Sequence, residues 1–285
     1  HCVAKSVKVH PQSVHLCYCF TPMRYLWGFE KEYFGKNQNI IFKWLKNALF
    51  SILKRFDVKT SHDVDCFFAI SNHIANRIKN VYQKDSITLY PPVDTEFYHL
   101  ANVERENYYL CVSALVPYKK IDLIIHAFNE LKYPLKIIGA GPLEHSLKKL
   151  ALSNIDFLGW VSDESLREYY QRCQALVFGA EEDFGIVPVE AMASGRPVIA
   201  YGNGGALETV IPLEGARDKG QGSPTGIFFY EQTPEALREA VSIFEKNSDK
   251  FDSKAIKNHA LKFDRKIFKE KIRGYIAEKC GSFKV

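Results

Sequence analysis

Short apolar runs and helix-periodic segments alternate along the second half of the chain. The apolar runs are rich in Val, Ile, Leu and Phe and predict buried strands, at 108–113, 135–138, 156–158, 175–178, 197–200 and 226–229. The segments between them space their apolar residues as one face of a helix, and the predicted helices begin near Lys120, Leu143, Asp163, Ile186 and Ala206, followed by one at 234–246. Alternation of this kind with short connections is typical of a doubly wound parallel sheet, an α/β fold.

Fewer strands are predicted before the adjacent prolines at positions 91 and 92. Apolar runs predict strands at 14–19 and 65–71, and helices are predicted at 40–56 and 72–82, the second capped by Asn72. Adjacent prolines disfavour helix and strand interiors, so they predict a stiff connector between domains. The stretch 254–279 is predicted to be helical, basic and amphipathic. We therefore expect domains at 1–93 and 94–253, and a C-terminal helical segment at 254–285.

Composition narrows the class of protein. A chain of 285 residues with 46% hydrophobic and 25% charged residues is ordinary for a soluble enzyme of one large or two modest domains. The net charge of +5 is too small and too scattered to indicate nucleic acid, but it suits a phosphorylated ligand or an anionic membrane surface. The seven cysteines show no paired CxxC pattern, which favours reduced thiols in the cytosol. No signal peptide and no spanning apolar run of about 18 residues is found, so a cytoplasmic protein is expected.

Two glutamates flank the predicted start of a helix. Pro188 fits the first turn of a helix, because the amide hydrogen that proline lacks has no intrahelical partner there. Glu182 then precedes the helix and Glu190 lies one turn inside it. The amides between them point out of the helix N-terminus, where free N–H groups and the helix dipole favour an anion such as a phosphate; they belong to Phe184, Gly185, Ile186 and Val187. A sugar nucleotide suits this arrangement, with a carboxylate at each end.

A second glycine-rich turn follows. The residues at 195–197 end the helix, 198–200 form a short buried strand, and the glycine-rich turn at 202–205 leads into another helix. Neighbouring turns at the carboxyl ends of strands are where open α/β sheets bind ligands. The alternative is that both glutamates are solvated and Gly185 is an ordinary turn residue, since two carboxylates at a given separation are common.

A long stretch resembles the retaining glycosyltransferases of family 4: the run FGIVPVEAMASGRPVIAYGNGGALETV, which contains Glu190, together with Glu182 eight positions before Glu190. It looks like the branch that contains bacterial mannosyltransferases of O-antigen and capsule assembly. The resemblance implies a GT-B fold of two Rossmann-like domains, with a complete C-terminal one. The N-terminal domain is expected to be truncated, because the family carries several strands before the first one predicted here, so we expect few strands before Pro91. The resemblance also implies that Glu182 contacts the transferred hexose and Glu190 the ribose hydroxyls.

The stretch 17–25, CYCFTPMRY, resembles the family motif Cys-Tyr-Cys-His-Thr-Pro-Met-Arg-Tyr on the acceptor side. The acceptor-side candidates are therefore Phe20, Thr21, Arg24 and Tyr25. Phe20 stands where histidine is usual, and Gly28 stands where aspartate is usual. A histidine can hydrogen-bond hydroxyls or shuttle a proton, and phenylalanine can do neither. Arg24 either binds the acceptor or packs on the surface.

Lys119 and Lys120 lie just past the strand at 108–113. Lysines at the carboxyl end of a strand can neutralise a diphosphate and the charge that grows on it as the glycosidic bond breaks. The segment 113–119 resembles the family's phosphate-binding segment, with Lys119 at its lysine. Ala114 stands where most members have arginine, and Lys120 is a candidate replacement. The alternative is that both lysines are only solvated.

The turn GAGP at 139–142 allows two interpretations. A GxG after a strand is found in NAD-binding folds, but Glu144 occupies the third glycine position and Pro142 intrudes. In the resembling family this turn, here with Gly141, lies beside the nucleotide, and the backbone at Trp160 and Val161 contacts the base. The Trp160 ring either stacks on the base or packs in the core.

The predicted helix at 40–56 carries an apolar stripe with basic residues elsewhere. The stripe consists of Ile41, Trp44, Leu45, Leu49, Ile52, Leu53 and Phe56, and the basic residues are Lys43, Lys46, Lys54 and Arg55. Such a helix either packs on its own domain or lies peripherally on the inner face of the cytoplasmic membrane, which suits a lipid-linked acceptor.

The leading hypothesis is a metal-independent retaining hexosyltransferase of polysaccharide biosynthesis, with no cofactor. By family likeness it moves mannose from GDP-mannose to a saccharide or lipid-linked acceptor, and no nucleic acid takes part. One alternative is a catalytically impaired protein that binds nucleotide sugars, because Phe20, Gly28, Ala114 and the expected truncation remove catalytic parts. Others are a transferase that uses a UDP-hexose and, from GAGP alone, a nicotinamide oxidoreductase.

Overall fold

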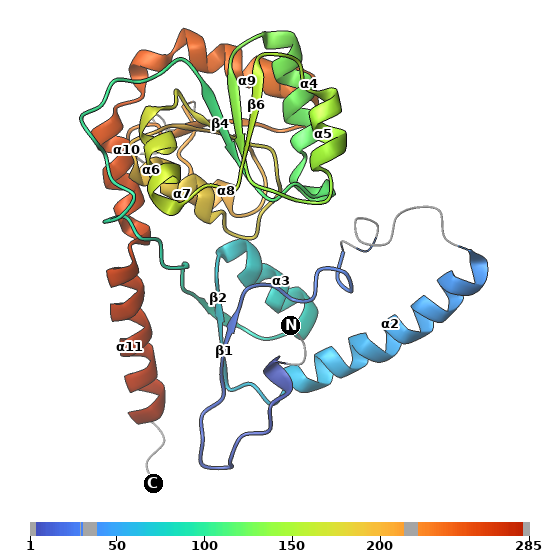
Figure 1. Ribbon diagram of the computed structural model, residues 1–285. Helices are drawn as coiled ribbons and strands as arrows, with labels where there is room; N and C mark the ends of the chain where they lie inside the picture. The colour runs from blue at the N-terminus through green and yellow to red at the C-terminus, as the bar shows by residue number, and fades with distance from the viewer. Residues whose placement is uncertain (1–3, 29, 31–38, 214–221, 282–285) are drawn as a thin grey trace. The chain divides into compact units, whose positions relative to one another are not determined.

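The structure is a computed structural model that describes residues 4–28, 30, 39–213 and 222–281. The chain forms two compact units, one of residues 1–90 and 268–285 and the other of residues 91–267. Each unit is described by itself below. Figure 1 labels their elements.

The unit of residues 91–267 is built on six parallel strands. They are β4 (Tyr109–Val112), β5 (Leu135–Ile138), β6 (Ile155–Gly159), β7 (Leu176–Phe178), β8 (Val198–Tyr201) and β9 (Gly226–Phe229), in the order β6-β5-β4-β7-β8-β9. This confirms the prediction of a doubly wound parallel sheet, and every predicted strand in this half is present. The strands lie between helices and are buried on both faces, because β-branched and leucine side chains such as Leu110, Ile137 and Ile199 are completely inaccessible.

Helices cover both faces of this sheet. They are α4 (Ile121–Leu131), α5 (Glu144–Leu150), α6 (Asp163–Arg172), α7 (Ile186–Ala193), α8 (Ala206–Thr209), α9 (Pro234–Lys246) and α10 (Ser253–Ala260). α4 packs against α5 and α9 on one face, and α7 packs against α6, α8 and α10 on the other (Figure 1). Three short 3-10 turns complete the unit: η2 (Pro117–Lys119), η3 (Ser248–Lys250) and η4 (Leu261–Phe263).

The strand order reverses between β4 and β7. The chain moves outward from β4 through β5 to β6, returns to the other side of β4, and moves outward again from β7 through β8 to β9. The connections leaving the carboxyl ends of β4 and β7 therefore diverge toward opposite faces of the sheet. The gap between such diverging connections is where open α/β sheets bind ligands.

The unit of residues 1–90 and 268–285 has a smaller parallel sheet. Its strands are β1 (Leu16–Cys19), β2 (Cys66–Ala69) and β3 (Ser86–Thr88), paired in that order. The helices are η1 (Ala4–Ser6), α2 (Ile40–Ser61), α3 (Asn72–Tyr82) and most of α11 (Arg265–Gly281). Three strands before Pro91 in the described part of the chain agree with the expectation of few. The described cysteines form no disulfide, as expected.

Three local predictions in this unit and its tail need correction. Ser71, not Asn72, caps α3, because the Ser71 hydroxyl accepts a hydrogen bond from the Ile74 amide at 3.1 Å. α2 continues past Phe56 to Ser61, since polar residues extend the helix once its first turns are formed. The predicted helix at 254–279 is divided by η4 and by Asp264, whose extended backbone (ψ 144°) separates α10 from α11.

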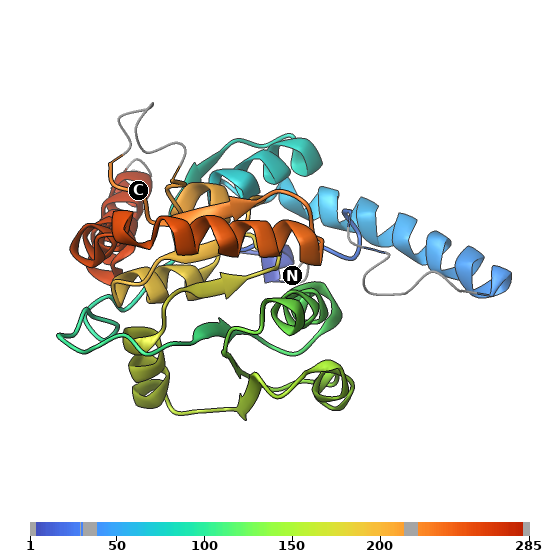
Figure 2. The same cartoon turned by 90° about the horizontal axis from the view of Figure 1, so that it is seen from above.

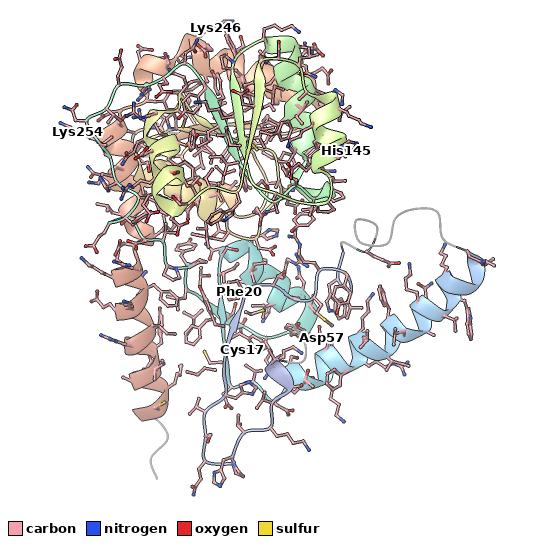
Figure 3. The ribbon with its side chains drawn as sticks, in the orientation of Figure 1. Cys17, Phe20, Asp57, His145, Lys246 and Lys254 are labelled. Carbon is pink, nitrogen blue, oxygen red and sulfur yellow. The ribbon has the colours of Figure 1, made fainter. Side chains whose placement is uncertain are left out.

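The carboxyl-terminal part of α2 is fixed by a buried charged network. Asp57 is fully buried and forms an ion pair with Lys5 at 2.8 Å. Its carboxylate also accepts hydrogen bonds from the Trp27 indole at 2.8 Å and the Tyr82 hydroxyl at 3.0 Å. Figure 3 shows Asp57 at the end of α2 nearest the sheet that carries Cys17. Among the described helices, none has both the length and the apolar character that crossing a bilayer requires.

Candidate functional site

The loops that follow β4 and β7 meet at the point where the strand order reverses. Lys119 ends η2 after β4, and Glu182 lies in the loop between β7 and α7. The Lys119 ammonium forms an ion pair and hydrogen bond with Oε1 of Glu182, and the two side chains are only 17% and 20% exposed. Two residues 63 positions apart, each predicted from the sequence, are therefore in direct contact.

The glycine-rich turn before α8 fixes the backbone at Glu182. The Gly205 amide donates to the Glu182 carbonyl at 2.7 Å, and Gly204 pairs with Glu182 as an isolated parallel bridge. A Cβ atom on Gly204 would lie 2.4 Å from the Glu182 carbonyl oxygen, and one on Gly205 would lie 2.3 Å from the Phe184 Cα. Only glycine allows this close approach of the two backbones. The glycine-rich turn at 202–205 therefore holds the loop that carries Glu182.

α7 begins at Ile186 with an open N-terminus. Gly185 precedes it with φ 90°, in the left-handed region, and no side chain caps the helix. The amides of Ile186 and Val187 occupy the first positions of the helix, where no intrahelical acceptor exists. The Phe184 side chain is 2% exposed and packs edge-on against Phe263 at 5.6 Å, so this side chain belongs to the core.

Glu190 lies one turn inside α7 and is partly buried. Its Oε2 accepts a hydrogen bond from the Tyr170 hydroxyl of α6 at 3.0 Å. Burial raises the pKa of the Glu190 carboxyl to about 7, against the lowering effect of the Tyr170 hydrogen bond, and Asp163 raises it further. Glu190 is therefore poised to change its charge near neutral pH.

The GAGP turn packs on the segment that leads to the lysines. The Leu115 amide donates to the Ala140 carbonyl at 3.0 Å, and a Cβ atom on Gly141 would lie 2.5 Å from the Leu115 carbonyl oxygen. Gly139 is equally close to Ser113, with 1.9 Å between a Cβ atom and the Ser113 oxygen. These glycines thus serve close backbone packing, and this contact positions the loop that carries Lys119. Lys120, at φ 56°, joins η2 to α4 and is partly exposed.

Trp160 follows the carboxyl end of β6, as Lys119 follows that of β4 and Glu182 that of β7. Its side chain is 81% exposed, so the ring is not part of the core. The Gly139 amide donates to the Gly159 carbonyl at 2.8 Å, which holds the start of the Trp160–Val161 segment beside the GAGP turn. Val161 is partly exposed.

The acceptor-side candidates lie in the other unit, just past β1. Phe20 is 60% exposed and meets Tyr18 edge-on at 5.3 Å (Figure 3). Thr21 donates to the Pro22 carbonyl at 3.2 Å. Tyr25 packs near Phe50 of α2, with ring centroids 6.2 Å apart, and Arg24 is partly buried. Phe20 is the most exposed of these four side chains.

Sequence reasoning missed Tyr170. The residue is completely inaccessible, and its position on α6 makes it look like an ordinary core residue of an amphipathic helix. One signal was available: Tyr170 lies on the helix just before the strand that leads to Glu182.

Within the described ranges, no group of three or more His, Cys, Asp or Glu side chains is close enough to hold a metal ion.

Comparison with known proteins agrees with this geometry. The chain is similar to the O-antigen chain mannosyltransferase C of Escherichia coli, with 30% identity over 156 aligned positions and coverage of 48% of this chain and 42% of that protein. The chain thus spans less than half of that relative. Its fold is similar to the sucrose-phosphate synthase of Thermosynechococcus elongatus, with a TM-score of 0.75, 17% identity and coverage of 96% of this chain and 69% of the other.

A second solved structure is that of Anabaena HepE in complex with UDP and glucose. The TM-score is 0.66 at 18% identity, over 79% of this chain and 66% of that one. Both structural likenesses support the GT-B fold. The family model described as "Glycosyl transferases group 1" matches residues 93–262, which contain every element of the six-stranded sheet and the Lys119–Glu182 pair. The chain is therefore a member of the group 1 glycosyltransferases.

Proposed function

We propose that this protein is a retaining, metal-independent hexosyltransferase of family 4 that uses a nucleotide-sugar donor. The observation that carries the proposal is the contact between Lys119 and Glu182 at the point where the strand order reverses, beside the open N-terminus of α7. A cation, exposed helix amides and a carboxylate are the groups needed to hold a diphosphate next to a sugar.

Each group has a role in the proposed reaction. Lys119 and Lys120, with the amides at the start of α7, neutralise the diphosphate, so the proposal needs no metal ion and no cofactor. Glu182 accepts hydrogen bonds from the hydroxyls of the transferred hexose, and Glu190 accepts them from the ribose. The base lies along the Trp160–Val161 backbone, next to the turn at Gly141.

The chemistry is a substitution at the anomeric carbon. The bond between C1 of the sugar and the diphosphate oxygen breaks, and the leaving nucleoside diphosphate takes the electron pair. An acceptor hydroxyl forms the new C1–O bond on the same face, and its proton passes to the departing phosphate. Lys119 stabilises the negative charge that grows on the leaving group.

The donor is proposed to be GDP-mannose and the acceptor a saccharide or lipid-linked saccharide of a polysaccharide pathway. The similarity to an O-antigen chain mannosyltransferase supports mannose. A UDP-hexose is the alternative donor, supported by the structural likeness to a protein crystallised with UDP and glucose.

Calorimetric titration with GDP-mannose, UDP-glucose and GDP tests the donor. We expect GDP-mannose to bind more tightly than UDP-glucose, and Lys119→Ala to weaken binding of each ligand that the parent protein holds. Lys246→Ala is the matched control, because Lys246 is exposed at the end of α9 (Figure 3). A protein that binds none of the three ligands is not a transferase with this donor site.

A catalytically impaired sugar-nucleotide binding protein is the second candidate, favoured by an exposed Phe20 where the family has histidine. It predicts donor binding without transfer to an oligosaccharide acceptor. Phe20→His, assayed beside the parent protein, separates the candidates. Transfer by the parent chain excludes the impaired protein, whereas transfer by the variant alone supports it.

We also propose that α2 lies on the anionic face of the cytoplasmic membrane. The helix exposes an apolar stripe and buries the opposite side: Trp44 is 70% exposed, Ile52 is 64% exposed and Leu49 is 53% exposed. Its one acidic residue, Asp57, is buried, so the exposed charges of the described helix are basic; they are Lys43, Arg55 and Lys59. Figures 1 and 2 both show α2 extending away from the sheet of its own unit. Apolar and basic side chains together favour anionic lipid.

Flotation with vesicles tests this contact. We expect binding to phosphatidylglycerol-containing vesicles and not to phosphatidylcholine alone, and loss of binding in Trp44→Glu/Ile52→Glu. The control Asn47→Glu/Ser51→Glu adds the same charge on the more polar side of α2 and should retain most of the binding. If the stripe variants instead convert a dimer to a monomer in ultracentrifugation, with no lipid binding by the parent protein, a second copy covers the stripe and the membrane proposal is wrong.

A further inference from the structure

Glu190 carries its charge in surroundings that hardly solvate it. In the described part of the chain, the one hydrogen bond to its carboxylate comes from the Tyr170 hydroxyl, at 3.0 Å to Oε2. A buried carboxylate needs such donors to keep its charge, because burial favours the neutral acid. The Tyr170 hydroxyl therefore fixes the position of the Glu190 carboxylate and favours its ionised form.

The donor of this bond is itself held rigidly. Tyr170 is completely inaccessible, and the ring of Tyr98 meets it edge-on at 5.6 Å with planes 80° apart. Tyr98 is 8% exposed, and its amide donates to the Asp94 carbonyl at 2.9 Å. α6 is fixed at its start, where the Ser162 hydroxyl accepts from the Ser165 amide at 3.3 Å. The phenol thus occupies one place relative to α7.

We propose that Tyr170 is a positioning residue for the nucleotide donor, which holds Glu190 by Oε2 so that Oε1 faces the paired hydroxyls of a ribose. The inference rests on the proposed function of this site and names a partner for it on α6. Tyr170 does not touch the ligand in this arrangement. It fixes the rotamer of the carboxylate that does, and a fixed carboxylate loses less side-chain entropy when the two ribose hydroxyls bind.

The same hydrogen bond favours the ionised form of Glu190. The titratable groups that act on Glu190 are Tyr170 and Asp163, both of α6, and Tyr98 lies next to them. Asp163 is exposed, so its repulsion is screened by solvent, whereas the Tyr170 bond is partly buried and is screened less. Loss of the phenol hydroxyl should therefore raise the pKa of Glu190 and leave more of it neutral at neutral pH.

Tyr170→Phe tests the proposal by its effect on GDP and UDP binding, measured by calorimetry from pH 6 to 9. Because the lost hydrogen bond is made to a charged group, we expect roughly tenfold weaker binding at pH 7. The pH at which binding is half lost should rise. In the transfer assay the KM for the donor should rise while kcat at saturating donor stays close to the parent value.

Tyr109→Phe is the matched control. Tyr109 is as buried as Tyr170, and its hydroxyl also donates to a glutamate, Glu245 of α9. Tyr109 is the first residue of β4, so it lies at the amino ends of the strands. The loops of the proposed ligand site follow the carboxyl ends. Both variants lose a buried tyrosine hydroxyl, but only Tyr170→Phe should change nucleotide affinity and its pH dependence.

Two further variants keep the test decisive. In the Glu190→Gln background, Tyr170→Phe should cause little further loss, since coupled residues are not additive. Replacement of Tyr170 by 3-fluorotyrosine keeps the packing and strengthens the phenol as a donor, so the pH of half-binding should fall; this variant serves if Tyr170→Phe does not fold.

Equal nucleotide affinities for the parent protein, Tyr170→Phe and Tyr109→Phe would overturn the inference while leaving the proposed function intact. Unchanged pH dependence in the fluorotyrosine protein would overturn it as well. A parent protein that binds neither GDP nor UDP would overturn the proposed function, and the inference with it.

Discussion

The partly buried position of Glu190 favours the role proposed for it and costs stability at the same time. A carboxylate inside the α7 side of the sheet is shielded from water, so its hydrogen bonds to a ligand are stronger than they would be at the surface. The same shielding raises its pKa to about 7, mainly through burial. The unfolded chain ionises this group near 4.5, so folding and ionisation oppose each other above that pH.

Glu190→Gln should make the protein more stable at pH 8 than at pH 4.5, relative to the parent protein. Because the folded pKa is raised, the favourable contribution of neutral Glu190 is fully present below about 4.5 and is lost as the pH rises through about 7. The difference corresponds to at most roughly 3 kcal/mol. Urea unfolding of both proteins at the two pH values measures it, and an equal difference at both would contradict it.

Gly204→Ala should disrupt the site without touching a ligand. Gly204 has φ 64°, and the new Cβ would lie 2.4 Å from the Glu182 carbonyl oxygen. We expect a stability loss of about 1–2 kcal/mol from the left-handed backbone, and a fall in donor affinity of at least about tenfold from displaced Glu182. Calorimetry and thermal unfolding measure both effects. Gly159→Ala, at φ 68° with nothing within 4 Å of its Cβ, isolates the backbone cost in thermal unfolding.

The sequence indicates individual candidate residues, but not the partners that the fold gives them. Glu182, Lys119 and the two glycine-rich turns follow from local patterns, because turn glycines and helix starts leave local signals. The contact between Lys119 and Glu182 is a tertiary contact. It forms because β4 and β7 are neighbours in the sheet. Tyr170 was missed because a buried tyrosine on a helix face is indistinguishable, in one sequence, from a packing residue.

At the scale of elements, the starts of helices are set by short-range chemistry. The predicted starts near Leu143, Asp163 and Ile186 lie within one residue of the observed ones. Pro142 and Gly185 precede two of these starts, and the Ser162 hydroxyl caps the third. The end of α2 and the break between α10 and α11 were predicted less well, because polar helix residues carry no strong stop signal and the break depends on contacts with a distant segment.

Ser71→Ala should destabilise α3, whereas Asn72→Ala should have a smaller effect. The Ser71 hydroxyl is buried and accepts the Ile74 amide at 3.1 Å, and loss of an N-cap typically costs about 1 kcal/mol. Asn72 instead accepts from the Thr88 hydroxyl at 2.7 Å in an exposed place. Thermal unfolding followed by circular dichroism compares them, and a greater loss in Asn72→Ala would show that the cap is assigned to the wrong residue.

At the scale of the whole molecule, the chain passes between its two units twice, near residues 90 and 267. Just inside the larger unit the two passages run side by side. The Val93 amide donates to the Phe263 carbonyl at 3.0 Å, and the Arg265 amide donates to the Val93 carbonyl at 3.0 Å. The hydroxyl of Thr95 donates to Asp264 at 2.5 Å in a buried place. Segments about 170 positions apart are thus joined, which no local pattern predicts.

Asp264→Ala should destabilise the larger unit more than Arg265→Ala. Asp264 is 7% exposed and accepts hydrogen bonds from the Thr95 hydroxyl and the Lys266 amide, so its removal leaves the buried Thr95 hydroxyl unpaired, at about 1–3 kcal/mol. Arg265 pairs with Asp94 at 2.5 Å, but its side chain is 43% exposed, and solvent screening limits such pairs to about 0–1 kcal/mol. Urea unfolding of the two variants tests the order, and the reverse order would show that the exposed pair carries the junction.

The ion pair between Lys119 and Glu182 also affects which molecules should bind weakly at this site. Inorganic phosphate alone would draw the ammonium away and leave an uncompensated acid, and a free monosaccharide would engage the acid and leave the ammonium without a counterion. A compound that joins both chemical groups at the correct separation satisfies both charges at once. Phosphate and free monosaccharides should therefore compete little at the proposed site, and inhibitors of it should combine an anionic and a polyhydroxylated part.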